Sequence, residues 1–271
     1  MQSMAANNRH WVAPGACDMH VHSTHSADGR SSMEAYCERA RAIGVKVLCF
    51  TEHFNNHPDD VCYGTYDPDA YFKELRIMQA RYAGELEILA GLEFAEPQEY
   101  PKELAWLRAY PYDCILGSQH FVGNTFVGRR IKAGERPEAV CAAYWSAMEA
   151  LVEAGGVDMI AHFDFPKRYL DDPAVIIDQS RVRTLLCKAI AKGIGIEINT
   201  SPLRSGQTAC MPGLQILDVY MQEGGRRITL GSDAHEAQEL ATHHAEVAEK
   251  LPDSLCVGVF RQHRFVPIEA L

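Results

Sequence analysis

The stretch Asp18-Met-His20-Val-His22-Ser-Thr-His25-Ser-Ala-Asp28-Gly29 decides how the rest of this sequence is interpreted. Alternate side chains of a β-strand point to one face, so His20 and His22 are expected to project from the same edge. Two neutral imidazoles held side by side are able to bind one cation. Asp28 comes six residues after His22, in a turn that ends at Gly29, and it can fold back as a third ligand. A half-exposed strand with incidental histidines is the alternative, which only the rest of the chain can test.

The composition indicates a globular chain with enough apolar material for a large core. Of the 271 residues, 47% are hydrophobic and 23% are charged, which is typical of a folded protein. This length suits one large α/β domain or two small ones. No apolar run reaches about 18 residues, so we expect no membrane span. The segment 1–10 lacks the apolar core of a secretory signal.

The cysteines indicate the cellular compartment of the protein, and the net charge indicates which classes of partner it can bind. The nine cysteines are scattered and never form a Cys-x-x-Cys pair. They are expected to be small buried hydrophobes, which favours a cytoplasmic location. The formal net charge is −10 without a block of lysine or arginine, which argues against a nucleic-acid partner. A small anionic substrate is compatible with this charge, because bound cations dominate the field of a site.

Apolar runs alternate regularly with amphipathic segments, and this order predicts successive strand–helix units. Seven strands are predicted, at 16–21, 45–51, 86–94, 114–116, 157–161, 195–198 and 227–230. Helices are predicted at 33–43, 69–83, 102–108, 137–154, 178–192, 213–223 and 236–250. The segments 55–67 and 121–136 are predicted to be loops, and 257–266 a short strand-like tail.

This pattern predicts the fold class α/β, as a distorted TIM-like (β/α)7 barrel. Residues 1–15 are expected to be an N-terminal tail and residues 16–271 a single barrel domain. An open, doubly wound sheet has the same alternation of elements. The barrel is favoured because parallel strands then bring their carboxyl ends to one rim, where active sites are built.

Polar or metal-binding side chains follow every predicted strand. They are His20, His22, His53, Glu93, His120, His162, Glu197, Asn199, Asp233 and His235. Buried acids such as Glu93 and Asp28 need cationic partners, because stranding a buried charge costs about 3–5 kcal/mol. Imidazole and carboxylate ligands without thiolate suit Zn, Fe or Mn. Six histidines and three acids exceed the needs of one ion, so two or three divalent metal ions are expected, with Glu93 as a candidate bridge.

The remaining histidines are expected to be incidental rather than ligands. They are His10, His25, His57, His243, His244 and His263. Of these, His25 and His57 lie in loops that open onto the predicted rim.

The motifs around the strand ends resemble the polymerase and histidinol phosphatase (PHP) superfamily, and they occur in the family's order from about residue 16 to 266. The stretch 197–204, Glu-Ile-Asn-Thr-Ser-Pro-Leu-Arg, is similar to one found in histidinol-phosphatases of this superfamily. The motifs are Asp18-Met-His20-Val-His22 with Asp28, Thr51-Glu52-His53, Gly91-Leu92-Glu93, Gly117-Ser118-Gln119-His120, Ala161-His162-Phe163-Asp164 and Gly231-Ser232-Asp233-Ala234-His235.

The resemblance implies a site for three metals in a seven-stranded barrel. It places the first metal on His20, His22, Glu93 and Asp233, the second on Glu93, His120 and His162, and the third on Asp28, His53 and His235. Matching members of the superfamily are phosphoesterases that use zinc, iron or manganese.

The expected function is that of a metal-dependent phosphomonoesterase, most specifically a histidinol-phosphatase of histidine biosynthesis. Glu93, Asp233 and Asp164 are the predicted catalytic residues, with Asp164 placing the leaving group or a ligand histidine. A small phosphorylated substrate is expected to be held by Arg204, Lys167, Arg168 and Asn199.

One departure leaves the leaving alcohol open. After His120 the chain reads Phe-Val-Gly-Asn, without the acidic residue expected in many histidinol-phosphatases. The alternatives are a PHP phosphoesterase acting on another small ester, a nucleotide or a phosphodiester, and a non-catalytic metal-binding barrel. The sequence leaves a homo-oligomer open.

Overall fold

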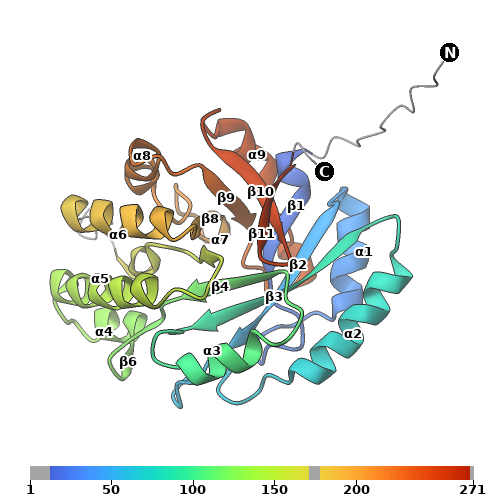
Figure 1. Ribbon diagram of the computed structural model, residues 1–271, viewed down its shortest axis with the longest axis horizontal. Helices are drawn as coiled ribbons and strands as arrows, with labels where there is room; N and C mark the ends of the chain where they lie inside the picture. The colour runs from blue at the N-terminus through green and yellow to red at the C-terminus, as the bar shows by residue number, and fades with distance from the viewer. Residues whose placement is uncertain (1–12, 171–177, 269–271) are drawn as a thin grey trace.

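The computed structural model describes residues 13–170 and 178–268, and its centre is one nine-stranded sheet (Figure 1). Its strand order is β1-β2-β3-β4-β7-β8-β9-β10-β11, and the first seven strands in this order are parallel to their neighbours. The predicted α/β alternation is therefore confirmed. These strands are β1 Cys17–Val21, β2 Val47–Phe54, β3 Glu87–Ala95, β4 Cys114–Ser118, β7 Met159–Ile160, β8 Gly195–Asn199 and β9 Arg227–Gly231.

The first and seventh of these strands approach each other at their carboxyl ends. Val21 forms a parallel bridge with Ala234, just beyond β9. The N–H of His22 donates to the carbonyl of Ala234 at 2.8 Å, and that of Asp233 donates to the carbonyl of His20 at 2.8 Å. The chain after β1 and the chain after β9 therefore share one rim.

At the amino end of β9, the neighbour on the side away from β8 is a hairpin that comes later in the chain. Strand β10 (Cys256–Arg261) runs parallel to β9, and β11 (Arg264–Pro267) returns antiparallel to β10. Arg261 forms an ion pair with Glu87 at 2.6 Å, at the start of β3. The predicted strand-like tail is thus an integral part of the sheet.

Helices lie around the outside of the strands (Figure 1). Local signals place α1, because the Ser32 side chain accepts the N–H of Ala35 at its start and Gly44 adopts φ 83° at its end. The larger helices are α1 Met33–Ile43, α2 Pro68–Arg81, α3 Pro101–Leu107, α5 Pro137–Ala154, α6 Gln179–Ala191 and α8 Leu214–Gln222. No helix of the described chain is both long and apolar enough to cross a membrane.

The two faces of the sheet bury separate apolar clusters. In β2, Leu48 and Phe50 pack in the cluster shared with the helices. Val47 and Cys49, which alternate with them, pack in a second cluster that also contains Phe260 of β10. Burial on both faces explains why this strand has a continuous apolar sequence.

Two predictions about secondary structure are wrong. The helix predicted at 236–250 is a short 3₁₀ helix, Ala237–Glu239, followed by α9, His244–Lys250. Ala241 and His243 between them adopt φ 52° and 66°. The Ala241 N–H donates to the Asp18 carboxylate at 2.8 Å, so a tertiary contact fixes the break.

The second wrong prediction is the loop at 121–136, which contains β5 (Phe121–Val122), β6 (Thr125–Phe126) and α4 (Val127–Lys132). Short α7, Ser201–Arg204, was also not predicted. His10 and most of the predicted N-terminal tail lie outside the described residues.

Candidate metal centre

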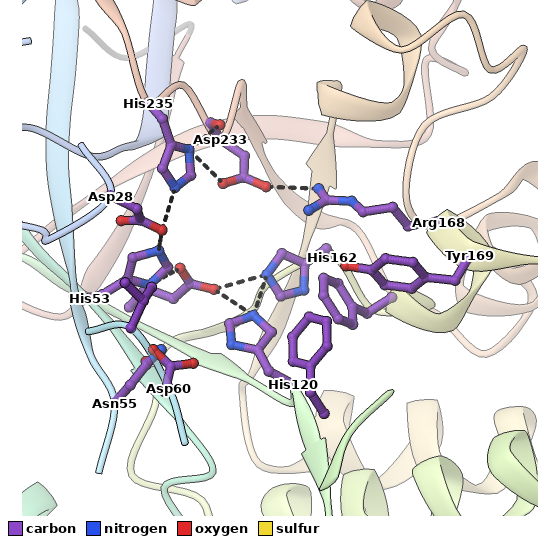
Figure 2. Close-up of a pocket in the computed structure, with 14 residues that line it drawn as sticks. Asp28, His53, Asn55, Asp60, His120, His162, Arg168, Tyr169, Asp233 and His235 are labelled. Atoms are coloured by element: carbon purple, nitrogen blue, oxygen red, sulfur yellow. Dashed lines mark hydrogen bonds and ion pairs between the residues drawn. The ribbon is translucent and has the colours of Figure 1, made fainter. Parts of the chain in front are cut away.

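The side chains predicted as metal ligands meet at the carboxyl ends of the parallel strands, beside a cavity of about 210 Å³ (Figure 2). Seven of them line this cavity, namely Asp28, His53, Glu93, His120, His162, Asp233 and His235. His20 and His22 lie directly behind them and are fully buried. The structure thus brings together all nine residues.

Glu93 lies at the centre of the group and is 1% exposed. Its Oε1 is 2.8 Å from Nε2 of His162 and 3.4 Å from Nε2 of His120. Its Oε2 is 3.0 Å from Nδ1 of His53 and 3.2 Å from Nε2 of His20. One carboxylate therefore faces imidazoles from four different strand ends, which is the geometry of a bridging ligand.

A second group of donors surrounds the end of β1. The Nε2 atoms of His20 and His22 are 3.0 Å apart, as strand alternation predicts. Oδ1 of Asp233 is 3.6 Å from Nε2 of His22 and 3.9 Å from Nε2 of His20.

A third group lies nearest the solvent. Oδ2 of Asp28 is 3.6 Å from Nε2 of His53 and 3.4 Å from Nε2 of His235. Sequence reasoning did not find Cys62, whose Sγ lies 3.5 Å from Oδ1 of Asp28. No motif marks this cysteine, because it comes from the long loop between β2 and α2.

The donor sets fit divalent cations. Zinc–nitrogen distances of about 2.0–2.1 Å imply about 3.3 Å between two ligands of a tetrahedral ion. The Nε2 atoms of His120 and His162 are 3.3 Å apart, and both face Glu93. Nδ1 of His20 lies 2.6 Å from Glu197, so a proton held there leaves the lone pair on Nε2 for a metal. Imidazole and carboxylate donors suit Zn, Fe or Mn.

The electrostatics of the cluster keep its carboxylates ionised. Burial by itself would raise the pKa of Glu93, but the imidazoles of His20 and His53 lower it well below its usual value. Burial likewise opposes ionisation of Asp233, yet hydrogen bonding to His22 and the charge of His20 lower its pKa. Such a concentration of buried negative charge needs cations close by.

Buried carboxylates behind the cluster hold the ligands in place. Oε1 of Glu197 contacts Nδ1 of His20, and Oε2 accepts the backbone N–H of His162 at 2.8 Å. Glu52 accepts hydrogen bonds from the hydroxyls of Ser23 and Ser26, each at 2.6 Å, in the turn before Asp28. The sequence showed Glu197 at a strand end and Glu52 within a motif, but it did not reveal these supporting roles.

The two predicted substrate-binding arginines lie beside open space. Arg168 Nη2 is 3.0 Å from Oδ2 of Asp233 and 2.6 Å from Oγ of Ser201, and its side chain lines the cavity (Figure 2). Arg204 donates to the carbonyls of Ser232 and Asp233, and it lines an adjoining cavity.

Three other predicted site residues do not line the cavity and instead stabilise the surrounding loops. Nζ of Lys167 donates to the carbonyl of Cys210 at 2.6 Å. Asp164 accepts the N–H of Gly213 at 2.9 Å, and Asn199 accepts the Ser201 hydroxyl at 2.6 Å. Asp164, Lys167 and Asn199 therefore bind neighbouring loops in this structure, and their expected roles toward a substrate stay predictions.

The histidines expected to be incidental have partners outside the cluster. The partners are Glu74 for His25, Phe121 for His57, Glu246 for His243, the Cys17 carbonyl for His244 and Asp158 for His263.

Comparisons with known proteins identify the family of this chain. The sequence model of the PHP domain matches residues 18–201. A histidinol-phosphatase of Lactococcus lactis is 26% identical over 247 residues, covering 86% of this chain and 90% of the relative. One of Bacillus subtilis is 26% identical over 268 residues, covering 86% of this chain and 98% of the relative.

A solved structure has the same fold. The histidinol phosphate phosphatase of Lactococcus lactis, crystallised with zinc, L-histidinol and phosphate, superposes with a TM-score of 0.79 at 24% identity. The match covers 92% of this chain and 98% of that one. The matched residues 18–201 contain seven of the nine candidate metal ligands. This chain belongs to the PHP domain family.

Proposed function

We propose that this protein is a metal-dependent phosphomonoesterase that hydrolyses L-histidinol phosphate to L-histidinol and phosphate. The observation that carries the proposal is the position of Glu93, whose two carboxylate oxygens face His162 and His53 on opposite sides. A carboxylate in this position would be able to hold two neighbouring ions, one through each oxygen. The histidinol-phosphatases among the relatives of this chain supply the specific substrate.

Three ligand groups would hold two or three ions of Zn, Fe or Mn. The groups are His20, His22, Glu93 and Asp233; then Glu93, His120 and His162; then Asp28, His53 and His235. When bound, such ions supply Lewis acidity toward the phosphoryl oxygens and activate water as the nucleophile.

The protein itself orients the phosphate. Arg168 is fixed by Asp233 and Ser201, and its side chain borders the cavity. A guanidinium held in this way can donate two parallel hydrogen bonds to phosphate oxygens. We assign Arg168 to the non-bridging oxygens of the substrate phosphate. Arg204 is assigned to the adjoining cavity, through which the site opens.

The size of the site favours a small monoester over a polymer. The cavity beside the ligand groups is about 210 Å³, and the adjoining cavity, which shares Asp28, Arg168, Asp233 and His235 with it, is about 480 Å³. Together they lie within the range of about 300–1,000 Å³ that is usual for small-molecule ligands. The net charge of −10 would repel a polynucleotide. These two properties support a metabolite-sized phosphate ester.

A phosphate-release screen with the protein loaded with Zn, Fe or Mn tests the proposal. The screen includes L-histidinol phosphate, other phosphorylated metabolites, p-nitrophenyl phosphate and its bis-ester, with a chelated sample as control. We expect the highest kcat/KM for histidinol phosphate and slow turnover of the bis-ester. If another ester has a higher kcat/KM, the assignment of histidinol phosphate is wrong, but the assignment as a phosphomonoesterase stands. No turnover of any ester would indicate a non-catalytic barrel.

A further inference from the structure

The cavity beside the metal centre has a second wall that contains none of the nine proposed ligands. Phe126, Phe165 and Tyr169 contribute aromatic rings to one side of this wall, and Asn55 and Asp60 contribute polar groups to the other side. Figure 2 shows Asn55 and Asp60 next to each other, across the cavity from Tyr169. A phosphate on the metal side would leave its alcohol facing this wall.

Asp60 is a free carboxylate at this wall. Among the described residues that line the cavity, it is the one acid outside the proposed ligand groups. Its Oδ1 accepts the N–H of Cys62 at 2.8 Å, whereas its Oδ2 accepts no hydrogen bond from the described chain. Asp60 also forms no ion pair with another described residue, so its negative charge is available to a ligand.

Asn55 supplies a second acceptor in the same place. The residue is 5% exposed, and its buried Oδ1 has no hydrogen-bond partner among the described residues. Buried polar atoms are nearly always hydrogen-bonded in folded proteins. An unpartnered buried acceptor at the edge of a cavity is therefore a site for a donor from a ligand.

The loop that carries these residues is held in place before any ligand binds. The N–H of Asp60 donates to the carbonyl of His57 at 3.0 Å. The ring of His57 stacks on that of Phe121, with centroids 3.9 Å apart and planes 18° apart. The loop between β2 and α2 is thus packed against β5, which preorganises the two acceptors.

We propose that Asp60 and Asn55 bind the positively charged part of the leaving alcohol. A protonated amine or imidazolium donates to their oxygens, and a planar ring packs on Phe126 and Phe165. This inference rests on the proposed phosphomonoesterase function and specifies its substrate class as the phosphate ester of a small cationic alcohol. The acidic residue expected after His120 is absent from this chain, where Phe121 follows instead. In this proposal Asp60, from the loop between β2 and α2, supplies the carboxylate for the alcohol.

The test compares kcat/KM for a cationic and a non-cationic ester in the metal-loaded protein. D60N removes the charge but keeps an oxygen that can accept the Cys62 N–H. The selectivity for L-histidinol phosphate over p-nitrophenyl phosphate is expected to fall about tenfold to a hundredfold, the range for a lost charged hydrogen bond. D60E, which keeps the charge, is expected to retain more of this selectivity than D60N.

D59N is the matched control, because Asp59 is an exposed neighbour that does not line the catalytic cavity. We expect its selectivity to equal that of the wild type. Equal loss of activity on both esters in D60N, or the same loss of selectivity in D59N, would overturn the proposal.

A further substrate separates this proposal from the proposed function. If the wild type hydrolyses p-nitrophenyl phosphate but not histidinol phosphate, the substrate assignment fails. O-Phosphoethanolamine then reports on the subsite, because its leaving alcohol carries an amine without an imidazole. A selective loss with this ester in D60N supports the subsite, and unchanged selectivity refutes it.

Discussion

Oε1 of Glu197 lies 2.6 Å from Nδ1 of His20, and both residues are fully buried. Its other oxygen accepts the backbone N–H of His162 at 2.8 Å. One carboxylate therefore orients a histidine at the end of β1 and the backbone of a second histidine after β7. Partners of this kind fix the tautomer of a ligating imidazole and increase its basicity.

We expect E197Q to weaken metal binding by about 10–100-fold, as outer partners of metal ligands usually do. A glutamine side chain has a single acceptor oxygen. It therefore cannot accept hydrogen bonds from both Nδ1 of His20 and the backbone N–H of His162, and one of these contacts is weakened. Competition with a coloured chelator measures the affinity. E87Q is the control, because Glu87 pairs with Arg261 at the opposite end of the sheet. Equal effects of both substitutions would contradict a local role for Glu197.

Metal removal should destabilise the protein. A ligand at 100 times its Kd stabilises the native state by about 2.7 kcal/mol, and one kcal/mol corresponds to about 2–4 °C in a chain of this size class. We therefore expect chelation to lower Tm by at least about 5 °C, and zinc or manganese to restore it, as measured by differential scanning fluorimetry.

A pair of histidine variants gives this melting experiment its specificity. H22A removes a buried ligand and should reduce the shift between the metal-free and metal-loaded states. H25A removes a histidine that pairs with Glu74 outside the three ligand groups, and its shift should match the wild type. A full shift in H22A would argue against the proposed ligand set.

Arg168 should be needed for every phosphomonoester. R168M removes a guanidinium that is held by Asp233 and Ser201 at the cavity wall. We expect kcat/KM to fall about 100-fold for histidinol phosphate and p-nitrophenyl phosphate alike, since charged hydrogen bonds contribute about 1.5–3 kcal/mol. R30M changes an exposed arginine of the adjoining cavity. It should lower kcat/KM less than threefold, which corresponds to about 0.6 kcal/mol of transition-state stabilisation. Comparable losses in the two variants would exclude a specific phosphate contact.

Glu96 should make stability depend on pH. Burial raises its pKa from 4.5 to about 7, although the charge of His120 and the backbone N–H groups of Phe121 and His120 oppose the rise. The native state then holds a proton that the unfolded chain releases, so this residue lowers stability as pH rises from about 4.5 to 7. Replacing it with glutamine removes this dependence.

Urea unfolding of the metal-free protein measures the effect. The stability of E96Q relative to the wild type is expected to increase by on the order of 3 kcal/mol between pH 4.5 and pH 8. E99Q, at an exposed neighbouring acid, should show no such trend. A pH-independent difference for E96Q would mean that the carboxyl is ionised throughout.

The sequence alone determined the alternation of strands and helices and the identity of the side chains at the rim. Period-two and period-3.6 patterns are local properties, so β3 and α5 were predicted with nearly their observed bounds. His20, Glu93 and Asp233 could be chosen because each follows an apolar run, and parallel strands bring such positions to one edge.

Only the tertiary structure decided which polar groups face the cavity and which serve as supports. Lys167, Asp164 and Asn199 follow strands as the metal ligands do, yet a loop carbonyl, a backbone N–H and a serine hydroxyl bind them. Asp60 comes from a loop without periodicity, which is held beside the site by contacts such as the packing of His57 on Phe121. The physical reason is that local patterns determine how a segment folds, whereas side-chain partners depend on contacts between segments far apart in the chain.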